Sequence, residues 1–414
     1  MLIEFSISNF RSFRSKQTLS MVAAPRIQKS IAKFRPEVDE DFPDLLKAAV
    51  IYGPNASGKS NLTLAFEFVA AFSRATAQSG ASILRNLIRP FAFDASLRDQ
   101  ASQFDIHFIS ERIRYNFVLQ VDRQRVLRET LHRYPAGEEQ LVYDRRFNGE
   151  IDEYAFGAVA EANEIVRDAW KKLTSPTVLF LAQAVANSSD DVGGLQPPMR
   201  WLRRMMTLND DFDWETLSEL SQEYAQKEDA AKSIARFLRD VDVPIQKIRA
   251  VKSDLTTKHH GPKPEGGKER YRLKFTHRSA LGDAELDFNE ESLGTQKLLA
   301  FWFPWQIRST PSSESDHAVL VVDELDSSLH PLIVTSIVER HLRAKQNAQL
   351  IFTTHDTHLM ESKLLRRDQI WATERDENGA TLLRSFHEFE GRESEDIQKR
   401  YLEGRYRGLP IVGA

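Results

Sequence analysis

The segment "AVIYGPNASGKSNL", residues 49–62, constrains the fold more than any other stretch of the chain. An apolar run of strand length stops at Gly53, a loop rich in small residues follows to Ser60, and helical spacing without Pro or Gly comes next. The loop matches the pattern G-x-x-x-x-G-K-[ST] completely, in the strand–loop–helix context that a phosphate-binding loop requires. We estimate a chance match in roughly one such chain in a hundred. The sequence therefore predicts nucleotide binding by an α/β fold.

The loop from Gly53 to Ser60, called the glycine loop below, supplies the first candidate site residues. Its backbone N–H groups can converge on phosphate oxygens, with the positive end of the following helix behind them. Lys59 is expected to reach the β- and γ-phosphates of ATP, and the Ser60 hydroxyl is expected to bind Mg²⁺. The alternative is a glycine-rich turn with an exposed lysine. The candidate contacts are Gly53, Pro54, Asn55, Ala56, Ser57, Gly58, Lys59, Ser60 and Asn61.

A second constellation lies in "AVLVVDELDSSLHP", residues 318–331. Its apolar run predicts a buried strand that ends in two carboxylates, Asp323 and Glu324. These are expected to face water or a ligand, because burying both unpaired would be costly. Asp323 is placed to hold Mg²⁺, and Glu324 is placed to take a proton from an attacking water. An acidic turn that caps the next helix is the alternative interpretation.

Two weaker sequence features also indicate contacts with a bound phosphate. In "ESLGTQKLL" the hydroxyl of Ser292 and the backbone at Gly294 can meet a phosphate at a helix start, although an ordinary N-cap explains Ser292 equally well. In "QLIFTTHD" His355 directly follows a predicted strand, and a neighbouring strand could deliver it to the acidic edge of the sheet. We expect His355 to contact the γ-phosphate, while a structural role is the usual alternative for a lone histidine.

Composition excludes several classes of protein. The 414 residues contain no cysteine, which rules out disulfides, thiolate zinc sites and a cysteine nucleophile. No run approaches the roughly 18 apolar residues of a membrane helix, and the start lacks a secretory signal, so we expect a cytoplasmic location without a membrane partner. The net charge of −4 argues against a polycation that coats nucleic acid. The basic stretch 258–278 is expected to be a solvated loop leading into a strand, with a nucleic-acid surface as the alternative.

The pattern along the chain predicts its organisation. Alternating residues at the start indicate a half-buried strand, and short β-type runs between 91 and 143 indicate an antiparallel layer beside it. The run "TVLFLAQ" predicts a further strand that ends at Gln183, and residues 197–238 have helical spacing. We therefore predict an ATPase lobe with a β subdomain at 1–190, a helical insertion at 191–255 and a second ATPase lobe at 256–414.

Taken in order, these motifs resemble the ABC-type ATPases, in the soluble branch that includes chromosome-maintenance and DNA-repair ATPases. The resemblance implies that Gln183 is the glutamine-loop metal contact, that Ser292 and Gly294 form the signature segment, and that Asp326 of "LDSSLHP" lies in the D-loop. It also implies that His355 is the switch histidine, and that Arg11 of "FSISNFRSF" lies near the nucleotide. Glu291 and Thr295 depart from the common signature.

The segments "PFAFD", "RRDQIW" and "YLEGRYRGLP" resemble a narrower group, the RloA-like ATPases of bacterial anti-phage and abortive-infection systems, which are related to the overcoming-lysogenization nucleases. That resemblance implies a Mg²⁺-dependent ATPase that forms a head-to-tail homodimer around ATP, with a higher oligomer left open. It implies a sensor or regulatory subunit that controls a separately encoded nuclease or toxin, since no nuclease motif is recognisable here. A DNA-gripping repair ATPase and a transporter ATPase subunit are the alternatives. The C-terminal segment either docks a partner or packs on the core.

Overall fold

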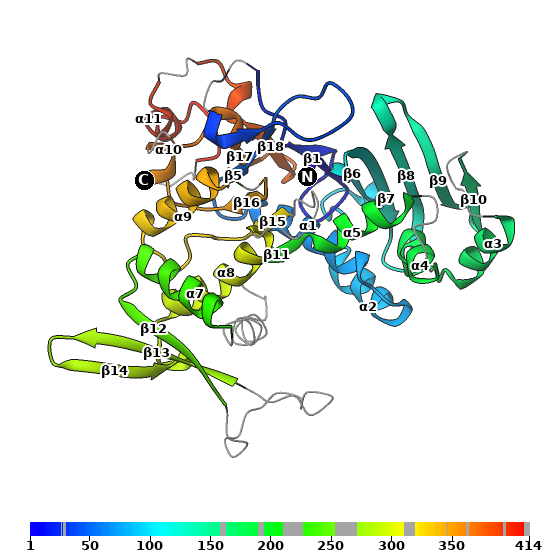
Figure 1. Ribbon diagram of the computed structural model, residues 1–414. Coiled ribbons are helices and arrows are strands. Elements are labelled where there is room, and N and C mark those ends of the chain that lie inside the picture. Colours follow the sequence, from blue (N-terminus) through cyan, green and yellow to red (C-terminus); the bar gives the residue numbers. More distant parts are fainter. Residues whose placement is uncertain are drawn as a thin grey trace. The chain divides into compact units, whose positions relative to one another are not determined.

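The computed structural model describes residues 1–25, 27, 30–157, 163–188, 194–209, 227–252, 271–309, 319–345, 347–361, 364–391 and 395–409 (Figure 1). The chain divides into two compact units. Unit 1 comprises Met1–Asn209, Pro311–Leu325 and Glu339–Ala414, and unit 2 comprises Asp210–Thr310 and Asp326–Val338. Both units combine helices with strands, which confirms the α/β class. The three-part division at residues 190 and 255 stays a prediction.

A six-stranded sheet forms the centre of unit 1, in the order β11-β15-β16-β5-β17-β18. The first five strands are parallel and β18 is antiparallel to β17. Strands β5, β15 and β16 are buried along their whole length, which is why their sequences read as continuous apolar runs. The bounds are β11 Met206–Leu208, β15 Val319–Val322, β16 Gln349–Thr353, β5 Ala48–Tyr52, β17 Ile370–Arg375 and β18 Thr381–Ser385.

Strand β11 lies within the segment that we expected to be helical. Its three residues pair in parallel with β15, from Met206 beside Leu320 to Leu208 beside Val322. A run this short carries no periodicity of its own, so its pairing partner decides its conformation. The helical pattern is realised on either side of it, in α5 (Gln196–Arg204) and α7 (Glu228–Asp240).

The second sheet of unit 1 has seven antiparallel strands in the order β10-β9-β8-β7-β6-β1-β2. It confirms the antiparallel layer predicted beside the first strand. The alternating apolar side chains of β6 and β7 give these strands one buried face. The bounds are β1 Leu2–Ser8, β2 Gln17–Ser20, β6 Ser102–Ser110, β7 Ile113–Val121, β8 Val126–Tyr134, β9 Gln140–Phe147 and β10 Asp152–Phe156, and β3 Lys33–Phe34 pairs with β4 Leu45–Leu46 as a separate ribbon.

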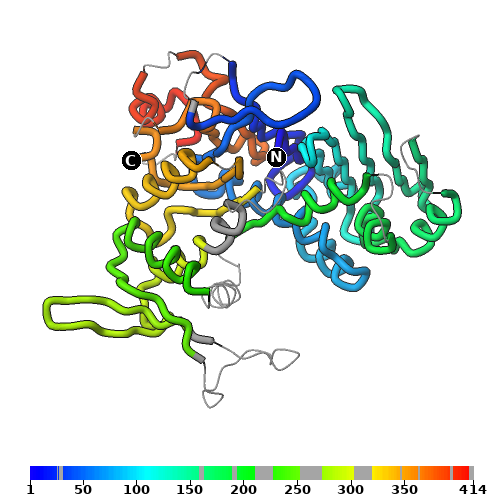
Figure 2. Tube along the Cα trace, viewed as in Figure 1, coloured from blue at the N-terminus to red at the C-terminus, as the bar shows by residue number. Residues whose placement is uncertain are grey.

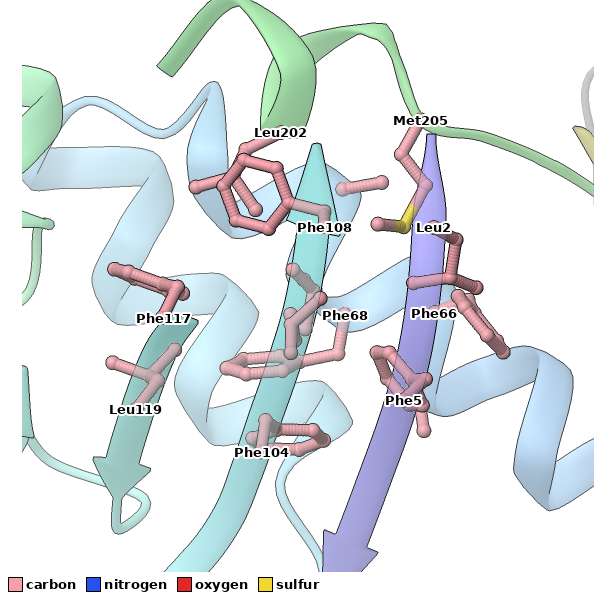
Figure 3. Close-up of a cluster of buried hydrophobic side chains, with 14 of the residues drawn as sticks. Leu2, Phe5, Phe66, Phe68, Phe104, Phe108, Phe117, Leu119, Leu202 and Met205 are labelled. Atoms are coloured by element: carbon pink, nitrogen blue, oxygen red, sulfur yellow. The ribbon is translucent and has the colours of Figure 1, made fainter. Parts of the chain in front are cut away.

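Helix α1 (Lys59–Ser73) joins the cores of the two sheets. Its Phe66 stacks on Phe5 of β1 with ring centroids 3.8 Å apart, and Phe68 packs 4.8 Å from Phe104 of β6 (Figure 3). Leu62 of the same helix belongs to a buried cluster that also contains Val321 of β15. A helix that is apolar on several faces is stable when protein covers it on those faces. This burial fixes the start of α1, and with it the end of the glycine loop.

The predicted strand ending at Gln183 is wrong. Residues Phe180–Ala186 form helix α4, and Gln183 lies in its second turn. The buried carboxylate of Glu129 on β8 accepts the backbone N–H groups of Phe180 at 2.6 Å and Leu181 at 3.0 Å. A negative charge at the first turn stabilises a helix, because those N–H groups have no partner within it. Further short helices among the described residues of unit 1 are α2 Ala77–Leu87, α3 Glu164–Leu173, α10 His358–Glu361 and α11 Ile397–Leu402.

Unit 2 holds α7, the antiparallel strands β12 (Ile245–Lys252), β13 (Tyr271–Ser279) and β14 (Gly282–Asp287), and helix α8 (Leu293–Ser309). Figure 2 traces β13 and β14 as a long hairpin. Strand β13 confirms that the basic stretch leads into a strand. Two of its cations pair with acidic side chains: Lys274 lies 2.8 Å from Asp287, and Arg278 lies 3.0 Å from Asp283. Residues 258–270 of that stretch lie outside the described residues. Helix α9 (Pro331–Arg343) runs from unit 2 into unit 1.

A buried histidine in α9 makes the stability of unit 1 depend on pH. His341 Nε2 lies 3.0 Å from the carbonyl oxygen of Lys47, and burial lowers the pKa of His341 to about 4. Because the unfolded pKa is near 6.5, this histidine stabilises the fold above that pH, and the contribution is lost as pH falls toward 4. The loss should be about 3 kcal/mol in the free energy of unfolding.

Urea denaturation between pH 7 and pH 4 should show this loss in the wild type. The His341→Gln variant keeps a neutral hydrogen-bond donor, so its free energy of unfolding should change less between pH 7 and pH 4. An equal dependence of the free energy of unfolding on pH in the two proteins would contradict the assignment.

Within the part of the chain that the structure describes, we find no helix with the length and apolarity needed to cross a membrane.

Candidate functional site

Three adjacent strands carry the predicted site residues to one edge of the parallel sheet. The glycine loop follows β5, His355 follows β16, and the acidic pair, Asp323 and Glu324, follows β15. Strand β16 lies between β15 and β5, and all three are parallel. Their carboxyl ends therefore lie along the same edge, which is where open α/β sheets bind ligands. Helix α1 starts at this edge.

Both glycines of the glycine loop fit against threonine side chains. Gly58 has φ +106°, and a Cβ atom there would lie 2.1 Å from Thr381 Oγ1. A Cβ on Gly53 would lie 2.3 Å from Thr373 Oγ1. These are distances that no substituted residue could adopt without moving β17 or β18. The pattern of glycines is therefore required by packing behind the loop, as well as by the phosphate that the loop is predicted to hold.

The same two threonines hydrogen-bond to Ser57 inside the loop. Thr373 Oγ1 lies 2.6 Å from Ser57 Oγ and donates to the carbonyl of Tyr52 at 3.2 Å. Thr381 Oγ1 donates to the carbonyl of Ser57 at 2.8 Å. Thr373 and Thr381 were not among the predicted site residues. A single threonine more than 300 positions away carries no motif that could have marked it.

Lys59, Ser60 and Asn61 occupy the transition from loop to helix. The Lys59 side chain is buried, and its Nζ donates to the carbonyls of Gly53 at 2.8 Å and Pro54 at 3.2 Å. Its ammonium group is thus held over the loop. Ser60 is exposed, and Asn61 Nδ2 donates to Ser12 Oγ at 2.7 Å, which ties the helix start to the turn after β1.

One buried hydroxyl orients the acidic pair. Thr353, the last residue of β16, accepts the backbone N–H of Glu324 at 2.7 Å and donates to Asp323 Oδ1 at 2.6 Å. Glu324 has φ +51°, a left-handed conformation that a non-glycine residue adopts at a cost of about 1–3 kcal/mol. Such conformations concentrate at functional sites. No sequence motif marks Thr353 as a site residue.

We predict that Thr353→Val lowers kcat for ATP hydrolysis about 10- to 100-fold with little change in KM. The substitution keeps the shape of the side chain and removes the hydroxyl, so both carboxylates lose their orientation, and small displacements at a reacting centre have effects of this order. Thr130→Val is the matched control, because Thr130 is also buried and donates to Asp144 at 2.7 Å, away from this edge. Steady-state kinetics decide the matter, and equal losses in both variants would contradict a positioning role.

His355 is exposed at the end of β16, in a turn that is tied to β5. The hydroxyl of Tyr52, the residue before Gly53, donates to the carbonyl of Asp356 at 3.0 Å. Asp356 in turn pairs with His358 Nδ1 at 2.6 Å. The backbone that carries His355 is therefore linked directly to the strand that carries the glycine loop.

The structure gives unequal support to the two remaining residues of unit 1. Arg11 lies in the turn after β1 with φ +51°, and its backbone N–H donates to the carbonyl of Arg89. Burial, together with the charge of Arg89, lowers the pKa of Arg11. The next residue, Ser12, contacts Asn61 at the glycine loop. Gln183 loses the strand-end position on which its proposed metal contact depended, since α4 is anchored to Glu129.

The predicted signature segment belongs to unit 2 and starts helix α8. Ser292 Oγ accepts the N–H of Thr295 at 3.2 Å. Ser292 therefore caps the helix, which is the N-cap interpretation of this residue. A Cβ on Gly294 would lie 2.9 Å from the carbonyl oxygen of Ser328. Lys297 Nζ donates to Ser327 at 2.9 Å. The helix start thus packs on the turn that begins at Asp326, the predicted D-loop.

Two of the segments that suggested the narrower resemblance, "RRDQIW" and "YLEGRYRGLP", contain side chains that pack within unit 1. Arg366 of "RRDQIW" is buried and donates to the carbonyls of Ala24 and Ile27, while Arg367 donates to those of Phe386 and Phe389. At the C-terminus Tyr401 is buried and donates to Gly408 at 2.8 Å. The C-terminal segment, as far as residue 409, therefore packs on the core.

The donors at the sheet edge fit a magnesium nucleotide. The glycine loop leaves no room for side chains at Gly53 and Gly58, a lysine lies over it, and the oxygen donors available are Ser60 and Asp323. Among the described residues no group of three or more His, Asp or Glu side chains could hold a metal ion. Mg²⁺ commonly binds to one or two protein oxygens together with substrate phosphates, so the donor set is of the expected kind.

Comparison with known proteins identifies the family. The model of the family described as "AAA domain, putative AbiEii toxin, Type IV TA system" matches residues 48–361. The chain belongs to this family. The match spans both the glycine loop and the acidic pair and confirms the ATPase type recognised from the motifs. This AAA-domain family member is accordingly a nucleotide-binding P-loop ATPase. No curated protein matches its sequence.

Solved structures that are similar to this chain include three SMC head domains. The SMC head domain from Thermotoga maritima is 14% identical over 93% of this chain and 98% of its own, with a TM-score of 0.42. An SmcHead bound to the C-winged helix domain of ScpA is 14% identical over 93% and 97%, with a TM-score of 0.47. An Smc head with an extended coiled coil, bound to the C-terminal domain of ScpA derived from Pyrococcus furiosus, is 13% identical over 93% and 96%, with a TM-score of 0.42.

Proposed function

We propose that this AAA-domain protein is a Mg²⁺-dependent ATPase that dimerises head to tail around ATP and regulates a separately encoded effector of anti-phage defence, a nuclease or toxin. The observation that carries the ATPase part is the meeting of the glycine loop, the acidic pair and His355 at one sheet edge. A bound Mg²⁺–ATP would supply the phosphoanhydride bond and the Lewis acid. The roles below belong to side chains of this protein.

Each residue at the edge has a task that its chemistry supports. Lys59 and the N–H groups of the glycine loop hold phosphate charge, and Ser60 and Asp323 offer oxygen to the metal. Glu324 accepts the proton of the attacking water, and its strained backbone, fixed by Thr353, presents the carboxylate in one orientation. His355 is exposed and can donate to phosphate oxygen.

The dimer is proposed because the signature segment offers a second phosphate contact at an exposed helix start. Ser292 and Leu293 are exposed at the start of α8, a 17-residue helix. The N-terminus of such a helix favours an anion, and a second copy of the chain would bring the phosphates of its own glycine loop. A head-to-tail pair would complete two equal sites.

The test of dimerisation uses the Glu324→Gln variant, which should bind ATP without hydrolysing it. Light scattering should give the mass of a monomer without nucleotide and at least twice that mass with Mg²⁺–ATP. The double variant Glu324→Gln, Lys59→Ala is the control, because it should not take up ATP and should stay monomeric. A mass that is independent of ATP in both proteins would refute ATP-driven association.

The defence role rests on the family description and is tested separately. Mass spectrometry of proteins that copurify with Glu324→Gln should identify a nuclease or toxin in the presence of ATP. ATP-dependent, salt-sensitive binding to duplex DNA without such a partner would instead support the DNA-gripping alternative. Copurification with a membrane protein would support a transporter subunit. The cross-strand ion pairs of β13 weigh against a broad basic DNA surface on the described residues of that hairpin.

A further inference from the structure

A pocket of about 540 Å³ opens in unit 1 beside the turn between β17 and β18. Its size is within the range of small-molecule sites. None of the nucleotide motifs contributes to it. Its walls include Arg14 from the turn after β1, Phe91, Phe93 and Asp94 of the "PFAFD" segment, and Arg375 and Gly379 of the turn.

The pocket adjoins the glycine loop through two residues. Thr381 Oγ1 donates to the carbonyl of Ser57 at 2.8 Å and lies 2.7 Å from Ser12 Oγ. Ser12 also accepts from Asn61 at 2.7 Å. Arg14 follows Ser12 by two positions, and Gly379 precedes Thr381 by two. The two chain segments that support the glycine loop and the start of α1 thus continue directly into the pocket walls.

The pocket presents an aromatic ring and cations to solvent. Phe93 is 71% exposed, although the neighbouring Phe91 is buried. The guanidinium carbon of Arg375 lies 6.0 Å from the centre of the Phe93 ring. Phe93 also packs edge to face on Phe91, with ring centroids 5.7 Å apart. Aromatic rings and arginine planes are the surfaces on which nucleobases stack.

Three carboxylates also line the pocket: Asp94, Asp376 and Glu377. Asp94 accepts from Arg14 at 2.7 Å and from the N–H of Ser96 at 3.0 Å. Hydrogen bonds from Ser96 and Arg14 lower the pKa of Asp94 to about 2, so the group is a carboxylate at neutral pH. Carboxylates commonly accept hydroxyl groups of ribose. Aromatic face, cation and acceptor together match a nucleoside better than a purely apolar ligand.

We propose that this pocket binds the base and ribose of the nucleotide whose phosphates lie on the glycine loop, with the base stacked on Phe93 and bordered by Arg375. The inference rests on the proposed ATP site and extends it to the nucleoside. It also assigns a task to "PFAFD", which the phosphate chemistry leaves without one. An aromatic side chain of a protein partner is the competing occupant.

Isothermal titration separates the nucleoside from the phosphates by comparing ATP with inorganic tripolyphosphate, both with Mg²⁺. For Phe93→Ala the affinity for ATP should fall about tenfold, the order expected when one stacked base loses its aromatic partner, while the affinity for tripolyphosphate stays unchanged. Arg375→Ala should act in the same direction with a smaller factor. Ile165→Ala is the control, because Ile165 is an apolar residue on α3 that is 80% exposed.

Four results are distinguishable. Loss of ATP affinity alone in Phe93→Ala supports the pocket. Equal losses for ATP and tripolyphosphate overturn it, because they point to a disturbed glycine loop. Unchanged ATP affinity in both pocket variants also overturns it and leaves the surface to a protein partner. Wild-type protein that binds neither ligand overturns the proposed nucleotide site, and the pocket with it.

Discussion

Replacement of Glu324 by glutamine is expected to lower the steady-state rate of ATP hydrolysis by about 100- to 10,000-fold, which is the usual contribution of a general base. Glutamine keeps the size of the side chain and cannot accept the proton of the attacking water. The backbone N–H of Glu324 would still donate to Thr353, so the geometry of the turn should persist. ATP affinity, measured by titration, should change little.

Two comparisons make this result specific. Glu150→Gln removes the charge of an exposed carboxylate in the turn between β9 and β10 and should leave the rate unchanged. Asp323→Asn should instead raise the Mg²⁺ concentration that gives the half-maximal rate, because Asp323 is assigned to the metal. An unaltered turnover rate in Glu324→Gln would exclude this residue as the base, whatever the dimer does.

The second large effect is expected from Lys59→Ala, which should weaken ATP binding by at least about 100-fold. The ammonium group lies over the glycine loop, where it donates to two loop carbonyls, and it is assigned to the β- and γ-phosphates. Loss of the two charge-assisted hydrogen bonds expected between Lys59 and these phosphates has a cost of this order. Fluorescent-nucleotide binding and isothermal titration both measure it.

Because Lys59 is buried, its loss also acts on the loop itself. Thermal unfolding should therefore accompany the titration, and a preserved transition shows that the fold survives. Lys16→Ala is a suitable control, since Lys16 is a cation of unit 1 whose side chain is 56% exposed and pairs with Asp105 on β6. Undiminished ATP affinity in a folded Lys59→Ala protein would contradict the assignment of Lys59 to the phosphates.

Elements with a strong local signal were predictable from the sequence. Strands β5, β15 and β16 are buried on both faces, so their apolar runs stand out, and β6 and β7 alternate over part of their length because one face is covered. Helix α4 was mistaken for a strand because a short apolar run is compatible with both conformations. Its helical state depends on Glu129, a buried carboxylate about 50 residues earlier in the chain.

The sequence by itself predicted a phosphate-binding loop, because the glycine loop, its lysine and the start of the helix that follows are consecutive residues. The sequence also predicted that the acidic pair and His355 each follow the end of a strand. Only the tertiary structure decided that their strands are neighbours, and that Thr353, Thr373 and Thr381 hold the acidic pair and the glycine loop in place. A lone threonine acquires such a role from the partner that strand pairing brings within hydrogen-bond distance, and no local pattern encodes that partner.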